Sequence, residues 1–249
     1  MRRLPVVILV MMAVLVAVVT GCGAHRYDGR LMVADSLMRS NPDSALAILE
    51  SLPVGRLTTE GDRAYHGLLI SQARYKAYVT ATSDSDINRA LSYYRTHSGE
   101  REKLTRAYIY KGAVMEELGH PDSAMYYYKS AEATAAPDDY FNLGYCNLRI
   151  GELYQAQISQ DSAAIMNLNN AIHYFTFIND TNYLIACFGD LGAICGTYYP
   201  DSTEYYLMHA IDLAKRYNPS KQYTYKSKLA GFNLTISMII LRQKSCLWM

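Results

Sequence analysis

Excess charge of either sign is missing from this chain of 249 residues. Its 24 Lys and Arg residues face 23 Asp and Glu residues, which gives a formal net charge of +1. Without surplus cations to neutralise phosphates, we expect no nucleic acid as a partner. Proline and glycine are also few, at 7 and 15 residues, while half of the residues are apolar. This composition excludes a disordered or collagen-like chain.

Motifs for catalysis and metal binding are absent too. Among the six histidines no two lie three or four residues apart, the spacing with which a helix presents a zinc pair. There is neither a glycine-rich phosphate loop nor a Gly-x-Ser-x-Gly turn. Glu116 and Glu117 are adjacent and would not face each other on a helix, so they are not a catalytic pair. We therefore expect no catalytic residue, no metal, no cofactor and no enzymatic activity.

The first 21 residues read as a secretory signal peptide. Arg2 and Arg3 precede an apolar run over residues 4–19, which is too short to span a membrane comfortably. The end of this segment, Val19-Thr20-Gly21-Cys22, resembles a bacterial lipobox.

The lipobox resemblance implies a cellular location for the mature protein. Cys22 would become the N-terminus and carry a diacylglycerol group and an N-acyl chain, which anchor a protein stably because each buried methylene contributes roughly 0.8 kcal/mol. Because Gly23 rather than Asp follows, the resemblance implies a Gram-negative cell-envelope lipoprotein on the outer membrane, facing the periplasm. The alternative is an uncleaved signal anchor with an incidental cysteine.

The dipeptide Asp-Ser recurs at intervals of 41, 38, 39 and 40 residues. The five copies at these intervals begin at Asp43, Asp84, Asp122, Asp161 and Asp201. Aspartate is a good N-cap because its carboxylate accepts the free N–H groups of the first helical turn, and three copies follow a proline. We therefore predict that each copy starts a helix with its aspartate as the N-cap. At the last copy, Glu204 could complete a capping box with the aspartate.

Each copy is followed by residues spaced four and then three apart, such as Ala124, Tyr128 and Ala131, which lie on one face of a helix. Gly112 lies on a preceding helical stretch, and small residues there and at Ala124 would let two antiparallel helices cross closely. In this arrangement, clearest over residues 105–137, the sequence resembles the tetratricopeptide repeat (TPR), a family with a 34-residue period.

The TPR resemblance implies an all-α fold, a right-handed superhelical solenoid of antiparallel helix pairs, with about five pairs and a C-terminal helix. The predicted domain covers residues 22–249 after the signal peptide at 1–21. Its approximate units are 26–60, 61–99, 105–138, 140–180 and 183–218, followed by an incomplete unit at 222–249. The apolar segment 229–241 is too short to span a bilayer and is predicted to be the first helix of an unfinished sixth pair. A truncated member of the family is one hypothesis for this ending.

Cysteines and tyrosines are predicted to be structural. Cys146 and Cys187 fall at matching positions of neighbouring repeats, and with Cys195 and Cys246 they are expected to be buried free thiols. The tyrosine clusters at 93–94, 126–128 and 205–206 are expected to pack in the core rather than to form a sugar-binding platform.

The resemblance also implies a working surface, because the concave side of such solenoids comes mainly from the first helix of each pair. Carried onto the two best-matched repeats, this gives a groove of Arg106, Ile109, Glu116, Glu117, Tyr145, Leu148, Glu152 and Gln155. Acidic residues predominate in that set, which favours a basic protein or peptide partner. We expect an envelope-tethered interaction scaffold without catalytic activity, in a sensing or regulatory role. The alternatives are a lipoprotein subunit of the outer-membrane barrel assembly machinery and, in another class, a glycan-capture or enzymatic lipoprotein.

Overall fold

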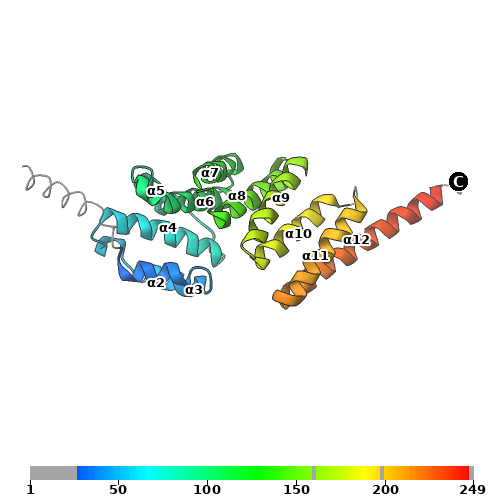
Figure 1. The fold of residues 1–249 in the computed structure, drawn as a ribbon, viewed down its shortest axis with the longest axis horizontal. Helices are drawn as coiled ribbons and strands as arrows, with labels where there is room; N and C mark the ends of the chain where they lie inside the picture. The colour runs from blue at the N-terminus through cyan, green and yellow to red at the C-terminus, as the bar shows by residue number, and fades with distance from the viewer. Residues whose placement is uncertain (1–26, 159–160, 197–198, 247–249) are drawn as a thin grey trace, which may run out of the picture.

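The computed structural model describes residues 27–158, 161–196 and 199–246, without the side chains of residues 157 and 158 and of those from residue 240 onward. Within these ranges the chain forms eleven α-helices and no strand, and consecutive helices pack against each other in adjacent pairs. The first two pairs lie together at one end of the long axis of the molecule, and α10, α11 and α12 lie at the other end (Figure 1). The predicted all-α solenoid of five helix pairs and a final helix is therefore confirmed. The signal peptide and Cys22 lie outside the described residues.

Each pair has a first and a second helix. The pairs are α2 (Gly29–Leu37) with α3 (Pro42–Glu50), α4 (Glu60–Lys76) with α5 (Ser85–Tyr94), α6 (Arg101–Glu117) with α7 (Pro121–Thr134), α8 (Tyr140–Leu153) with α9 (Asp161–Phe177), and α10 (Thr181–Cys195) with α11 (Pro200–Tyr217). The last helix, α12, spans Pro219–Cys246. Short turns of 3-10 helix lie at Val54–Arg56 and Ser98–Glu100, and a π-helical turn lies at Tyr154–Ile158. The units predicted from 105, 183 and 222 begin two to four residues after the helices that open them.

The Asp-Ser copies do mark the starts of the second helices, but the aspartates are not their N-caps at the three copies that follow a proline. There the helix begins at the proline itself, and the N-caps are Asn41, His120 and Tyr199. Proline suits the first helical position because its missing N–H would be unpaired there in any case. The aspartates then lie in the first turn, where the helix dipole favours a negative charge. The capping box predicted for Asp201 and Glu204 is consequently wrong.

Asp84 is the N-cap residue of α5, and no proline precedes it, but its side chain makes no capping hydrogen bond. Instead it accepts a hydrogen bond from Lys111 of α6, a lysine that is almost fully buried. The fourth copy, at Asp161, opens α9, and the residue before it lies outside the described part of the chain. The Asp-Ser motif thus predicts where the second helices start, but it does not predict the hydrogen-bond partner of each aspartate.

Glycines on the first helices let the second helices approach closely. A Cβ built on Gly112 would lie 2.7 Å from Cε1 of Tyr128, and one on Gly151 would lie 2.9 Å from Cγ of Leu168. Both contacts are shorter than real side chains allow, so the close crossing predicted at Gly112 is confirmed. Gly67 in α4 is more extreme, since its Cβ would lie 2.3 Å from the carbonyl oxygen of Asp86.

Most of the core is one continuous cluster from α2 to α10, and a smaller cluster joins α10, α11 and α12. Tyr94 and Tyr128 are fully buried as predicted, but Tyr126 and Tyr205 are exposed, so only part of each tyrosine cluster packs in the core. The prediction of buried free thiols is confirmed for the three cysteines whose side chains are described, Cys146, Cys187 and Cys195.

Candidate functional site

Two neighbouring cavities lie between the first helices, with volumes of about 350 Å³ and 580 Å³. The smaller cavity is bounded by α2, α4, α6 and α8, and the larger one by α4, α8 and α10 with one residue each from α6 and α12. Both are lined by Arg39, Lys76 and Tyr145. Because they share these residues, the two cavities adjoin, and we call the two together the groove.

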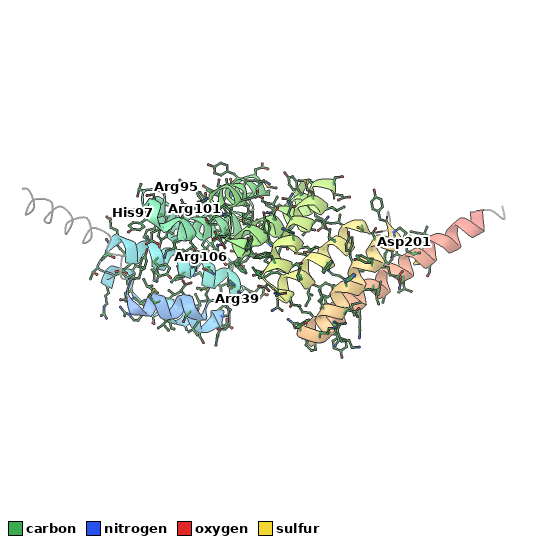
Figure 2. All side chains as sticks on the ribbon, in the orientation of Figure 1. Arg39, Arg95, His97, Arg101, Arg106 and Asp201 are labelled. Carbon is green, nitrogen blue, oxygen red and sulfur yellow. The ribbon has the colours of Figure 1, made fainter. Side chains whose placement is uncertain are left out.

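Arg39, in the turn after α2, spans the groove. Its guanidinium donates to the carboxylate of Asp180, the residue before α10, which is 141 positions later in the chain. The guanidinium carbon also lies 5.2 Å from the centre of the Phe141 ring on α8. Arg39 extends from the end of the first pair that faces the middle of the solenoid (Figure 2). The first and fifth pairs are thus joined directly, a contact that a linear stack of repeats would not make.

Arg106, on α6, forms the back of the smaller cavity. Its guanidinium donates to both carboxylate oxygens of Asp35, at 2.6 and 3.1 Å, and to the side-chain oxygen of Gln72 at 2.6 Å. Burial acts to raise the pKa of Asp35, but the hydrogen bonds and charge of Arg106 outweigh it and hold that pKa below its ordinary value. Two parallel bonds of this kind fix the orientation of a guanidinium. Arg106 therefore serves as a structural link between α2, α4 and α6.

Arg149, on α8, plays the same part in the larger cavity. It donates to Glu116 at 2.6 Å and to Glu152 at a shorter distance, while the hydroxyl of Tyr128 donates to Glu116 at 2.5 Å. Burial raises the pKa of Glu152 to about 7. Both glutamates therefore already have ion-pair partners within the protein, and neither offers an unpaired charge to a ligand.

Lys76, at the end of α4, differs from these arginines because it forms no ion pair with any described residue. It is half-buried between the two cavities, and burial together with the charges of Arg39 and Arg106 lowers its pKa. Glu117 also lacks an ion pair among the described residues, and its carboxylate accepts one backbone N–H, from Ala81, at 2.9 Å. Lys76 and Glu117 thus line the groove without an ion pair to any described residue, as does Lys221 of α12.

Six of the eight predicted groove residues line it: Arg106, Ile109, Glu117, Tyr145, Leu148 and Glu152. Glu116 lies behind the larger cavity, bonded as described above. Gln155 lies in the π-helical turn and lines neither cavity. The expected acidity is not found, because the lining holds five acids and five bases: Asp35, Glu102, Glu117, Glu152 and Asp180 against Arg39, Lys76, Arg106, Arg149 and Lys221.

Sequence reasoning missed the contributions of α2, α4 and α10, among them Arg39, Lys76 and Asp180. One of these could have been found. Lys76 is the seventeenth residue of α4, and Glu117 is the seventeenth residue of α6. Lys76 could therefore have been predicted from the matching position of Glu117. Arg39 and Asp180 lie in turns outside the repeat pattern, and only the folded chain brings them together.

Other kinds of site find no support in the described chain. Its His, Cys, Asp and Glu side chains form no group of three or more that could hold a metal ion. None of the helices in the described ranges is long and apolar enough to cross a membrane. No protein-family model matches the chain, and no curated protein matches it in sequence.

Proposed function

We propose that this protein is a scaffold of the TPR type that binds a segment of a protein partner in the groove and catalyses nothing. The observation that carries the proposal is the groove itself, which is built from the first helices of consecutive repeats and consists of two adjoining cavities of about 350 Å³ and 580 Å³. Its walls mix aromatic rings with fixed ion pairs, a composition that protein interfaces share.

The charges of the groove indicate what the bound segment carries. Arg106 and Arg149 are occupied by the protein's own carboxylates, so they hold the walls in place rather than attract a ligand. Lys76 and Glu117 have no such partner, and an acidic and a basic group on the bound segment would pair with them. A segment with charges of both signs thus fits better than the basic one that the sequence analysis favoured.

We further propose that the protein is held at the cell envelope by acyl chains on Cys22, on the outer membrane and facing the periplasm, where it acts in sensing or regulation. The lipobox-like sequence supports this location. Replacing Cys22 with Ala should abolish labelling by radioactive palmitate and release the protein from the membrane fraction. Retention of both in the variant would contradict the tether.

Crosslinking in intact cells tests the groove. A photoreactive amino acid is placed at Asn182 or at Tyr78, which line the larger cavity, and at Tyr126 on the outer side of α7 as a control. We expect the two groove positions to yield adducts with the same protein and Tyr126 to yield none with it.

A pair of charge reversals sharpens this experiment. Lys76→Glu should lower the yield of that adduct at least tenfold, whereas Lys129→Glu, an equal change on the exposed face of α7, should leave it within twofold. Equal yields from all three crosslinking positions, or an adduct that Lys76→Glu does not weaken, would exclude the groove as the binding site.

A further inference from the structure

The twelfth residue of the first helices is small in every pair from the second onward, and α12 continues the series. These residues are Ser71, Gly112, Gly151, Gly192 and Ala230. At the three glycines the second helix of the same pair presses a large side chain against the position. A Cβ there would lie 2.7 Å from Tyr128, 2.9 Å from Leu168 and 2.8 Å from Leu207, respectively. In the third, fourth and fifth pairs the twelfth position is therefore where the second helix packs, and we call this position the seat.

On α12 this seat is open. Ala230 is exposed, and a Cβ on the next residue, Gly231, would have no neighbour within 4 Å. Further along, Leu234 and Met238 are 67% and 70% exposed. Gly231 differs in this from six other helical glycines, each of which faces a packed neighbour: Gly67, Gly112, Gly144, Gly151, Gly189 and Gly192.

The side of α12 that faces the preceding pair is packed normally. Tyr225 is buried, and its ring occupies the space beside Gly189 of α10. Tyr225 belongs to the smaller core cluster together with Ile185 and Leu207, and Leu229 packs against this cluster. Past these contacts α12 runs on beyond the end of α11 (Figure 1). It thus makes the contacts of a first helix with the repeat before it, while no described helix occupies its own seat.

The charge of α12 restricts what can cover it. The helix contains Lys221, Lys226, Lys228, Arg242 and Lys244 and no acidic residue. Two copies of α12 laid side by side would bring ten positive charges together, which opposes self-association. An acidic helix would instead be attracted. A bilayer surface is the weaker match, since small residues such as Ala230 and Gly231 bury little area in lipid but let another helix backbone come close.

We propose that α12 binds an acidic amphipathic helix of a partner protein, which lies against it as the second helix lies in a complete pair. The native second helices define the pattern that such a partner carries, a large residue with small residues four before and three after it, as in Ala124, Tyr128 and Ala131. The large residue lies over Ala230. The face around Ala230 contributes no residue to the groove, which α12 lines only with Lys221 near its start, so this face can hold its partner whether or not the groove binds a peptide.

A designed helix serves as the probe. It is the α7 sequence, Pro121–Thr134, with Lys129→Glu to make it more acidic and a hydrocarbon staple on its outer face to keep it helical. The matched control peptide also carries Tyr128→Ala. Binding to the full-length protein in detergent is followed by fluorescence anisotropy. We expect the first peptide to bind, the control to bind at least tenfold more weakly, and added salt to weaken the binding.

Two variants of the protein locate the site. Ala230→Leu fills the seat and should weaken binding at least tenfold. Thr235→Leu, an equally exposed position about 140° around the same helix, should change it by less than twofold. Both substitutions are on the surface, and circular dichroism is used to check that the proteins remain folded.

Several results would overturn the proposal. One is failure of the acidic peptide to bind, and another is equal binding of the peptide to the Ala230→Leu and Thr235→Leu proteins. A dimer in sedimentation experiments that the peptide does not dissociate would also contradict the proposal. Adsorption to phosphatidylglycerol vesicles that Ala230→Leu leaves unchanged, in the absence of peptide binding, would assign α12 to a lipid surface instead.

Discussion

Arg39 and Asp180 form an ion pair between the first and fifth helix pairs, with the aspartate 4% exposed and the arginine 70% exposed. The buried partner is fixed at the start of α10, whereas the exposed one must reach across the groove to meet it. The pair therefore acts as a tie between two parts of the solenoid that share no sequence neighbourhood.

Replacing Asp180 with Asn should loosen this tie without unfolding the protein. Because Arg39 remains largely in water, we expect the free energy of unfolding to fall by only about 1 kcal/mol. Amide hydrogen exchange should accelerate in α2 and α3 and stay unchanged in α6 and α7. A double-mutant cycle with Arg39→Met provides the control. If the two single effects simply add, the ion pair does not couple the two ends.

Gly67 cannot accept even a methyl group, since the atom it would strike is the backbone carbonyl of Asp86 rather than a flexible side chain. Gly67→Ala should therefore lower the free energy of unfolding by about 2 kcal/mol or more. Gly231→Ala is the matched control, because its space is open and alanine favours a helix over glycine by up to about 1 kcal/mol. Urea denaturation should show opposite signs for the two substitutions, and a loss of stability at Gly231 would contradict the open seat.

The Arg106 link predicts a stability effect that depends on pH. Arg106→Met leaves Asp35 partly buried without its cation, which should lower the free energy of unfolding by about 2 to 3 kcal/mol at pH 7. Because Arg106 holds the pKa of Asp35 below 3.8, its contribution is present above that pH and is lost as the pH falls further. The difference between variant and wild type should consequently shrink below about pH 3.8 in urea titrations. A difference that stays constant there would mean that Arg106 acts through packing alone.

Asp190 on α10 should show the opposite dependence. Burial raises its pKa from 3.8 to about 6, so between these values the folded protein keeps a proton that the unfolded chain releases. The free energy of unfolding should then decrease as the pH rises from about 4 to about 6. Asp190→Asn removes this decrease and should make the protein roughly 1 to 3 kcal/mol more stable at pH 7.

The test compares the pH dependence of the free energy of unfolding in wild type with that in Asp190→Asn. A single profile is not enough, because Glu152, whose pKa is raised to about 7, titrates in both proteins. Parallel profiles for wild type and Asp190→Asn would show that the carboxyl is already ionised at pH 4.

The architecture was predictable because it repeats. Five Asp-Ser dipeptides at almost equal spacing located the second helices, and the small residue at Gly112 located a close crossing. The caps were not predictable in the same way, since a proline at the first helical position moves the start of the helix by one residue. The partner of Asp84 was hidden as well, because Lys111 belongs to the next repeat.

The groove was predictable where it follows the repeat and not elsewhere. The lining residues on α6 and α8 could be predicted from their positions in the repeat. The net charge of the lining could not, because the sequence does not show that Arg149 forms an ion pair with Glu116. The tie between Arg39 and Asp180 depends on the curvature accumulated over four pairs, which no local spacing encodes.

Lys76, Arg39 and Tyr145 belong to both cavities, so the two are not independent compartments. Small fragments soaked in separately would compete for those three side chains and exclude one another. One molecule long enough to occupy both would avoid that conflict, which makes inhibitors grown outward from a fragment at Lys76 a better starting point than mixtures of short ones.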